Sequence, residues 1–405
     1  MIPFSPPRID QEIVDEVVAA LTSGWITTGP RTKQFEKEIA QYCNVENVLA
    51  VNSWTAGAEM LLKWFGVKEG DEVIVPAYTY CATANIVIHC GAKPVMVDVG
   101  DDFCLSVEAL AKAITPKTKV IIPVDLGGMP CDYDSIFQAI EKASNIFEPE
   151  SENQKRLGRI LVMSDAAHSF GALYKGKKIG IQADLTVFSF HAVKNLTTAE
   201  GGAIVINLPN SFDNLSIYKK LNTLSLHGQS KDALAKTQKG AWEYDVEEAG
   251  FKCNMTDILA AIGLIELRRY DRDTLRRRKQ IFDQYSNAFS KYNWAIIPQY
   301  HSAEAESSFH LYLLRIKNVT LQERNEIIQL IFDKDVSVNV HYKPLPLLSF
   351  YANEGYLIDN FPKSKSFWES EITLPVYFNL TDDQVSCVVD AVVGSYNEVK
   401  NEKIV

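Results

Sequence analysis

The sequence predicts an α/β fold: a large, mostly parallel sheet with helices on both faces, followed by a smaller C-terminal α+β unit. Between about residues 10 and 270, short apolar runs alternate with stretches of helix length and helix spacing. Alternation of this kind is typical of a parallel sheet covered on both sides. Beyond about residue 270 the alternation stops. We therefore expect a large domain at 1–270 and a small domain at 271–405.

The expected elements of the large domain follow one another along the chain. A helix is predicted at 9–21, with apolar side chains on one face, and amphipathic helices are expected farther on, for example at 57–65 and 107–114. The polar stretch at 145–157 is interpreted as a surface loop between a helix and a strand. Apolar runs that predict buried strands lie at 48–52, 72–75, 94–98, 120–125, 160–163, 186–190 and 203–206.

The small domain is expected to begin after a strongly apolar helix at 257–269. The charged run at 268–279 is interpreted as a solvated helix that links the two domains. After it, the pattern predicts strands at 311–316 and 336–340 and helices at 321–332 and 382–399.

Composition excludes several classes of protein. Of the 405 residues, 46% are hydrophobic and 23% charged, which is near the globular average and excludes a disordered, collagen-like or coiled-coil chain. A net charge of −10 gives no electrostatic reason to bind nucleic acid or an anionic membrane. No run is long and apolar enough to span a bilayer, and the N-terminus does not resemble a secretory signal.

The seven cysteines are dispersed, with no CxxC pair and no histidine at zinc-ligand spacing. We therefore expect reduced thiols, a cytoplasmic protein and no metal site.

Four segments with chemically useful side chains follow expected strands, at the end where open α/β sheets bind ligands. In the first, at 52–57, a strand gives way to a helix across Ser53, Thr55 and Ala56. The free amides and positive dipole end of a helix bind phosphate. Taken alone, these residues are also explained by an ordinary Ser/Thr N-cap.

The second segment is 164–169, where Asp165 follows the apolar run at 160–163. Its carboxylate should point into the crevice, either as an N-cap or as the partner of a cationic ring nitrogen. His168 lies three residues further on. It could hydrogen-bond an oxygen of a ligand, or it could pack within the turn.

The third segment contains Ser189 and Lys194 and leads to a Gly-Gly pair at 201–202. Most lysines are solvated, but a lysine in a crevice loop would have a lowered pKa and could act as a nucleophile. The fourth segment, at 78–80, ends in Tyr80, whose ring could stack on a flat ligand or pack in the core.

Together these side chains form the set that pyridoxal phosphate (PLP) requires. A lysine holds the cofactor as a Schiff base, is displaced by the substrate amine and then moves protons. An aspartate keeps the pyridine nitrogen protonated, so that the ring accepts the electrons of a carbanion. An aromatic side chain covers the ring, and hydroxyl groups with a helix N-terminus hold the phosphate.

Four motifs resemble those of the DegT–StrS family of nucleotide-sugar aminotransferases, which are fold-type I PLP enzymes. They are GWITTGPRTKQFE at 24–36, DAAHSFGA at 165–172, SFHAVKNLTTAEGG at 189–202 and GFKCNMTD at 250–257. The similarity extends in the family's order to HYKP at 341–344 and LPVYF at 374–378. The resemblance implies the fold of aspartate aminotransferase. The segment at 145–157 departs from the usual family length, but it lies between motifs.

The resemblance also implies roles for the residues. Lys194 would be the Schiff-base lysine and Asp165 the partner of the pyridine nitrogen. His168 would lie near the 3-oxygen of the cofactor. Tyr80 occupies the place of a stacking aromatic, where relatives often have Trp.

The phosphate would be held by Thr55, Ala56 and Ser189. Asn254, in the GFKCN motif, would reach the phosphate of the neighbouring subunit's cofactor. The resemblance thus implies a homodimer with shared active sites.

The reaction implied by the resemblance begins with glutamate, which gives its amino group to PLP and leaves pyridoxamine phosphate. The acceptor is the keto carbon of a nucleotide-linked 4-keto-6-deoxy sugar or 4-keto-pentose, and the form of the 189–202 motif favours amination at C4. Amination at C3 is the nearest alternative, and a keto-cyclitol acceptor is more distant. Two other classes are disfavoured: a sugar C3-dehydratase, which would have His in place of Lys194, and a non-catalytic regulator, which would not need both Lys194 and Asp165.

Overall fold

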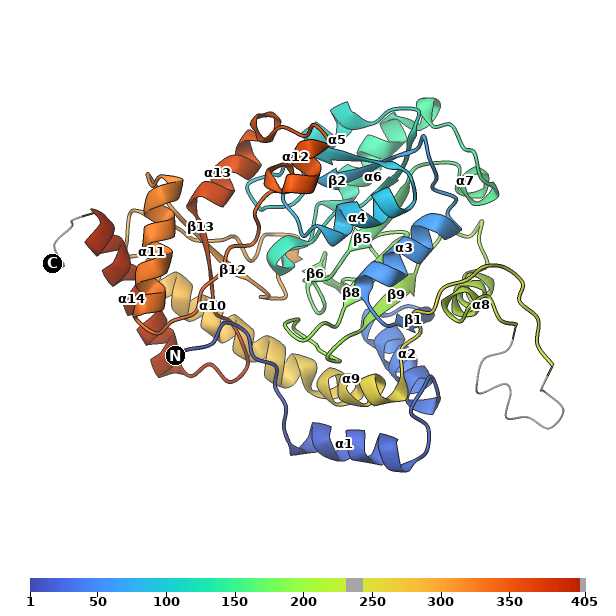
Figure 1. Ribbon diagram of the computed structural model, residues 1–405, viewed down its shortest axis with the longest axis horizontal. Coiled ribbons are helices and arrows are strands. Elements are labelled where there is room, and N and C mark those ends of the chain that lie inside the picture. Colours follow the sequence, from blue (N-terminus) through green and yellow to red (C-terminus); the bar gives the residue numbers. More distant parts are fainter. Residues whose placement is uncertain (231–242, 401–405) are drawn as a thin grey trace.

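The computed structural model describes residues 1–230 and 243–400, and a seven-stranded sheet lies at its centre (Figure 1). The strands lie in the order β1-β9-β8-β5-β4-β2-β3. Every neighbouring pair is parallel except the two that β9 makes with β1 and β8. The prediction of a mostly parallel sheet is confirmed. The strands are β1 (Asn47–Val51), β2 (Glu72–Pro76), β3 (Lys93–Val97), β4 (Thr118–Ile121), β5 (Leu161–Asp165), β8 (Leu185–Ser189) and β9 (Gly202–Ile206).

Helices cover both faces of the sheet because side chains alternate along each strand. Val48 and Ala50 of β1 pack into one buried cluster with α2, α5, α6 and α9, whereas Leu49 and Val51 pack into a second cluster with α3, α4 and α8. The helices are α2 (Pro30–Cys43), α3 (Trp54–Trp64), α4 (Ala82–His89), α5 (Val107–Ala113), α6 (Tyr133–Lys142), α8 (Asn214–Ser225) and α9 (Asp257–Arg269).

A buried carboxylate joins α2 to α9. Asp257 Oδ1 accepts hydrogen bonds from the amides of Gly29, at 2.8 Å, and Thr32, at 2.9 Å, and Oδ2 accepts one from Arg31 at 3.1 Å. The N-cap residue of α2 is Gly29, which has no side chain to cap the helix. Asp257 therefore supplies the cap from a distant part of the chain.

The segment at 145–157 is not the surface loop that its polar sequence predicted, because it contains the helix α7 (Glu152–Leu157). Ser151 and Gln154 form a capping box at the start of this helix. The same two side chains donate hydrogen bonds to the carbonyl oxygen of Phe65, just beyond α3, at 2.8 and 3.2 Å. The polar residues of the segment are thus a helix cap and an anchor to the core.

The C-terminal part contains an antiparallel sheet of β10 (Ala295–Ile296), β12 (Tyr312–Ile316) and β13 (Glu371–Leu374). It shares a buried cluster with α10 (Arg276–Phe289), α11 (Leu321–Asp333) and α14 (Asp382–Lys400). The prediction of a strand at 336–340 was wrong: among the described residues this stretch makes only isolated bridges, from Val336 to Ile2 and from Asn339 to Thr373. The smaller elements are β6 (Leu173–Tyr174), β7 (Lys177–Lys178), β11 (Ala305–Glu306), α12 (Ser349–Asn353) and α13 (Pro362–Ser370).

The connection between the two parts is one nearly continuous helical rod. A π-helical turn, Tyr270–Leu275, joins α9 to α10. The interpretation of 268–279 as a solvated helix needs correction, because Arg269 and Arg278 are buried. Arg269 pairs with Glu266, and Arg278 donates to two main-chain carbonyl groups. The domain boundary at residue 270 stays a prediction.

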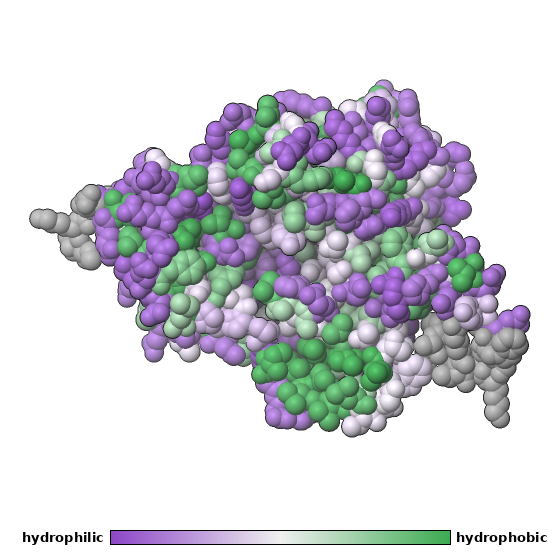
Figure 2. Space-filling view, viewed as in Figure 1, coloured by the Kyte–Doolittle hydropathy of each residue, from purple (hydrophilic) through white to green (hydrophobic). Residues whose placement is uncertain are grey.

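The N-terminal helix α1 (Gln11–Thr22) lies against α9 at the edge of the molecule. Ile13 and Ala20 are its buried residues, whereas Val14, Val18 and Leu21 are 41–51% exposed. Figure 2 shows the resulting apolar patch over α1. The predicted apolar face therefore forms, but this chain covers only part of it. No helix in the described residues is long and apolar enough to cross a bilayer.

Candidate active site

A cavity of about 380 Å³ opens where β2, β5 and β8 end, and residues 341–342 of the C-terminal part close one side of it. Most of the predicted site residues come together here. Ala56 and Asn254 are not among the side chains that line it. The predicted residues that line the cavity are Thr55, Tyr80, Asp165, His168, Ser189 and Lys194.

Lys194 reaches the cavity from a loop that main-chain hydrogen bonds stabilise. The loop begins after β8, where the Phe190 amide donates to the Gly201 carbonyl at 2.8 Å, and the Lys194 amide donates to His191 at 2.9 Å. Burial lowers the pKa of Lys194 to about 8, against the raising effect of the Asp165 carboxylate. The ammonium group has no hydrogen-bond partner among the described residues, so it is free to meet a ligand.

Asp165 ends β5 as a buried carboxylate. Its Oδ2 accepts a hydrogen bond from the Thr83 hydroxyl at 2.9 Å, and its Oδ1 accepts one from the Ala167 amide at 3.2 Å. Burial raises the pKa of Asp165 to about 7, although both donors and the charge of Lys194 act in the opposite direction. A cationic ligand atom would compensate this carboxylate, which burial otherwise disfavours.

His168 is a buried, neutral ring with a defined tautomer. The Gly127 amide donates to Nδ1 at 3.2 Å, so the ring proton lies on Nε2, which is 3.2 Å from the Tyr342 hydroxyl. Burial, reinforced by Lys194, lowers the pKa of His168 well below its ordinary value. Nε2 is therefore a donor that faces the cavity.

The N-terminus of α3 forms one end of the cavity. Ser53 is its N-cap and accepts a hydrogen bond from the Ala56 amide at 3.1 Å, so the capping interpretation holds for this serine. The strand β9 approaches this helix end very closely: a Cβ atom on Gly202 would meet the Trp54 amide nitrogen at 2.8 Å and the Phe188 carbonyl oxygen at 2.7 Å. Glycine at 202 is what allows the strand to pass here.

Asn254 lies beside the end of β1, outside the cavity. Its Nδ2 donates to the Thr28 hydroxyl at 2.6 Å, and its Oδ1 accepts from Lys252 at 2.6 Å. Tyr80, in contrast, lines the cavity and is 59% exposed, with its ring 5.9 Å from that of Tyr342.

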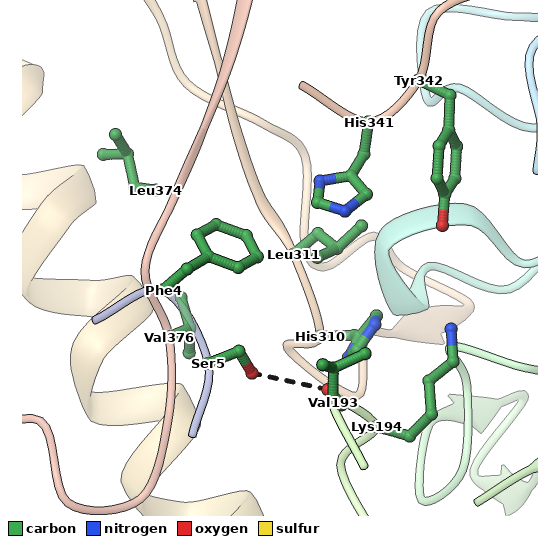
Figure 3. Close-up of a pocket in the computed structure, with 10 residues that line it drawn as sticks. All are labelled: Phe4, Ser5, Val193, Lys194, His310, Leu311, His341, Tyr342, Leu374 and Val376. Atoms are coloured by element: carbon green, nitrogen blue, oxygen red, sulfur yellow. Dashed lines mark hydrogen bonds between the residues drawn. The ribbon is translucent and has the colours of Figure 1, made fainter. Parts of the chain in front are cut away.

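Sequence reasoning gave no site role to several side chains that reach this region. Figure 3 shows a smaller pocket next to the main cavity, and His310, His341 and Tyr342 line it together with Lys194. His341 and Tyr342 belong to the HYKP motif, but nothing in the local pattern of that motif indicates a crevice. The N-terminal segment was missed too: Phe4 stacks on His341 at 5.6 Å, and the Ser5 hydroxyl is 3.5 Å from the Val193 carbonyl (Figure 3).

These residues fit pyridoxal phosphate. Lys194 is an unpartnered amine with a lowered pKa, Asp165 is a buried carboxylate suited to a ring cation, and a helix N-terminus lies at one end. The cavity volume is within the usual range for a cofactor or small-molecule site.

Fold and site together define a PLP-dependent aminotransferase. The chain belongs to the DegT/DnrJ/EryC1/StrS aminotransferase family, which matches residues 7–393.

Solved structures of sugar aminotransferases are similar to this chain over nearly its whole length. A putative sugar aminotransferase from Streptococcus pneumoniae, Spr1654, in its pyridoxamine phosphate form, is 47% identical with a TM-score of 0.95, covering 98% of this chain and 100% of that one. Helicobacter pylori PseC, an aminotransferase involved in the biosynthesis of pseudoaminic acid, is 26% identical with a TM-score of 0.85, covering 98% and 99%. Among curated proteins, the Bacillus subtilis spore coat polysaccharide biosynthesis protein SpsC is 37% identical over 96% of each chain.

Proposed function

We propose that the enzyme transfers the amino group of glutamate to C4 of a nucleotide-linked 4-keto-6-deoxy sugar, for use in a polysaccharide or glycan. One observation supports the transfer chemistry: Lys194, which has no hydrogen-bond partner among the described residues, and the buried carboxylate of Asp165 line the same cavity. The form of the 189–202 motif supports amination at C4. The similarity to SpsC supports a polysaccharide as the destination. The dispersed free cysteines support a cytoplasmic location.

In this proposal Lys194 holds the cofactor and moves the proton. With a pKa of about 8, its Nζ atom is partly uncharged near neutral pH, so it can act as a nucleophile and can both accept and return a proton. Bound PLP supplies an electron-accepting ring and a carbon that carries the amino group between the two substrates. Asp165 holds the ring nitrogen in its protonated form.

The remaining side chains orient the cofactor. His168 would donate from Nε2 to the 3-oxygen of the bound cofactor; in this structure that nitrogen lies 3.2 Å from the Tyr342 hydroxyl. Tyr80 covers one face of the ring. Thr55, the Ala56 end of the helix and Ser189 bind the phosphate at the start of α3.

Borohydride reduction of the purified enzyme tests the first of these roles. Reduction should fix the cofactor covalently to the peptide that contains Lys194. Lys194→Ala should still bind pyridoxamine phosphate but lose turnover. Cofactor found on another lysine would disprove the assignment.

The regiochemistry needs a substrate test. The enzyme would be incubated with glutamate and either a 4-keto-6-deoxy or a 3-keto nucleotide sugar, and 2-oxoglutarate release would be measured. NMR of the product then shows which carbon carries nitrogen. Turnover of the 3-keto sugar alone would overturn the proposal for C4.

We further propose that the enzyme is a homodimer whose sites are shared. The apolar patch over α1, formed by Ile9, Val14, Val18, Leu21 and Ile26, is a surface that a second copy of this chain would cover. Asn254 lies outside its own chain's cavity, which is consistent with a role at the partner's phosphate.

Mixing two inactive variants tests the shared site. In a mixed dimer of Lys194→Ala and Asn254→Asp, one site carries both defects and the other carries neither, so activity should partly return. The matched control mixes Lys194→Ala with Asp165→Asn: both residues line the same chain's cavity, so every mixed dimer should stay inactive. No recovery in the first mixture, with subunit exchange confirmed by mass, would contradict sharing.

A further inference from the structure

A second buried carboxylate lies directly behind the candidate site and has no place in the chemistry above. Asp125 follows β4, is fully buried and does not line the cavity. Its main chain is joined to that of Asp165, because the Asp125 amide donates to the Asp165 carbonyl at 3.1 Å. The Asp165 amide in turn donates to the Pro123 carbonyl at 2.8 Å. The two carboxylates therefore stand at the ends of neighbouring strands.

Three donors stabilise the charge of Asp125. Its Oδ1 accepts from the Cys131 amide at 2.9 Å and from the Tyr133 hydroxyl at 2.8 Å, and its Oδ2 accepts from the Ser169 hydroxyl at 2.6 Å. All three are neutral groups, so the charge has no salt-bridge partner among the described residues. Burial raises the pKa of Asp125 to about 6, although these donors act in the opposite direction. The carboxylate is mainly ionised near neutral pH.

The hydrogen bond from Ser169 ties Asp125 to the site. Ser169 belongs to the turn that follows Asp165 and carries His168. The same turn is held from the other side, where the Gly127 amide donates to His168. Asp125 thus fixes the turn and adds a negative charge next to Asp165. Burial is the main cause that raises the pKa of Asp165, and the nearby charge of Asp125 acts in the same direction.

We propose that Asp125 is a positioning residue whose buried charge, acting through Asp165, raises the affinity of the site for a protonated heteroaromatic nitrogen. The inference rests on the proposed role of Asp165. Burial disfavours the ionised form of Asp165, so a cation beside its carboxylate is already favourable. A second carboxylate behind it makes a cation at the ring nitrogen more favourable, because both negative charges are relieved at once. Since Asp125 does not line the cavity, its contribution is electrostatic and should depend on the charge at the ring nitrogen.

The test compares two ligands that differ only at that nitrogen. Cofactor-free full-length protein is titrated with PLP and with 1-deazapyridoxal phosphate, in which a CH group replaces the ring nitrogen. The measured quantity is the ratio of the two affinities. For Asp125→Asn, which keeps the size of the side chain, we expect this ratio to fall about tenfold, with the affinity for the deaza analogue within about twofold of wild type. Equal loss of both affinities, or no loss, would overturn the proposal.

Asp165→Asn in the same assay separates the two claims. If it leaves the ratio unchanged, the proposed role of Asp165 fails. If it lowers the ratio while Asp125→Asn does not, only the inference about Asp125 fails.

Ser169→Ala is a second variant that tests the same proposal if Asp125→Asn does not fold. Losing the hydroxyl donor raises the pKa of Asp125, so the affinity ratio, relative to wild type, should fall at pH about 6.5 and recover at pH about 8.5. The other titratable groups around this carboxylate are Asp165, Tyr133, Cys104 and Cys131. Burial raises the pKa of Tyr133 and Cys131 well above their ordinary values, and burial holds the pKa of Cys104 at about 11 despite the Cys131 hydrogen bond, so these three groups stay neutral over this range. Asp165, with a pKa of about 7, titrates within the range in both proteins, which is why the ratio is compared with that of wild type at each pH. A wild-type ratio at both pH values would overturn the proposal.

Discussion

Removing the charge of Asp165 should make the cofactor-free protein more stable, and the gain should grow with pH. The pKa of this carboxyl is about 7 in the folded chain and 3.8 in the unfolded chain. A carboxyl whose pKa is raised by folding binds its proton more tightly in the folded state, so folding stability falls as pH rises from the unfolded to the folded pKa. Asp165→Asn has no such proton to lose.

The size of the effect follows from the two pKa values. Integrated between pH about 5.5 and pH about 8, the group costs the wild-type protein about 2 kcal/mol of stability, at about 1.4 kcal/mol per pKa unit. The substitution keeps the local hydrogen bonds, because an amide oxygen still accepts from Ala167 and the Thr83 hydroxyl can turn to Thr79, 3.2 Å away. The charge is therefore the main thing that changes.

Urea unfolding of the cofactor-free protein at the two pH values measures this difference. We expect the stability of Asp165→Asn relative to wild type to rise by about 2 kcal/mol between them. Asp390→Asn, an exposed carboxylate on α14, is the control and should show no such change. If the stability of Asp165→Asn relative to wild type stays constant or falls with pH, Asp165 is not a carboxylate whose ionised form is disfavoured by burial, and the assignment is refuted.

Three further outcomes are expected. In the cofactor-free protein, labelling with an amine-specific reagent at several pH values, followed by peptide mass spectrometry, should show that Lys194 reacts with an apparent pKa near 8. Asp165→Asn should lower this pKa, because the negative charge that stabilises the ammonium form is gone. A pKa near 10 in the wild-type protein would contradict the burial argument. Gly202→Ala should weaken the binding of PLP far more than the binding of pyridoxal, which lacks the phosphate, because the new Cβ atom would clash with the start of α3. Equal weakening of both ligands in equilibrium titrations would show that the clash disturbs more of the site than the phosphate end. Asp257→Ala should cost about 2–4 kcal/mol in urea unfolding, since it strips the cap from α2, whereas a loss below about 1 kcal/mol would mean that water replaces the cap.

The position of Lys194 and Asp165 in one cavity could be predicted from the sequence, because both residues follow apolar runs that indicate strands. The carboxyl ends of parallel strands share one edge of a sheet, so the pattern of strands alone brings the residues after them together. The strands themselves are short, buried on both faces and bounded by polar segments, which is the pattern that single-sequence reasoning detects best.

The contribution of His310, His341 and Phe4 could not be predicted in the same way. They reach the site through contacts between parts of the chain that lie far apart in sequence, and no local periodicity encodes such contacts. The strand expected at 336–340 failed for a related reason: its apolar alternation is real, but the stretch meets β13 only at the Asn339–Thr373 bridge and forms no longer ladder there. The helix α7 was hidden because a capping box is built from the same polar residues that indicate a loop.

The position of β9 in the sheet has a consequence for how the protein is made. Strand β1 is complete at Val51, yet its ladder partner β9 begins only at Gly202, and the next bridge to β1 comes from Asn254. On the ribosome, at 5–20 residues per second, β1 waits on the order of 10 s for its neighbour. During that time its apolar side chains face solvent or other nascent segments. We therefore expect the segment that ends at Val51 to need holdase chaperones during this interval, and slower translation before residue 202 would lengthen that need.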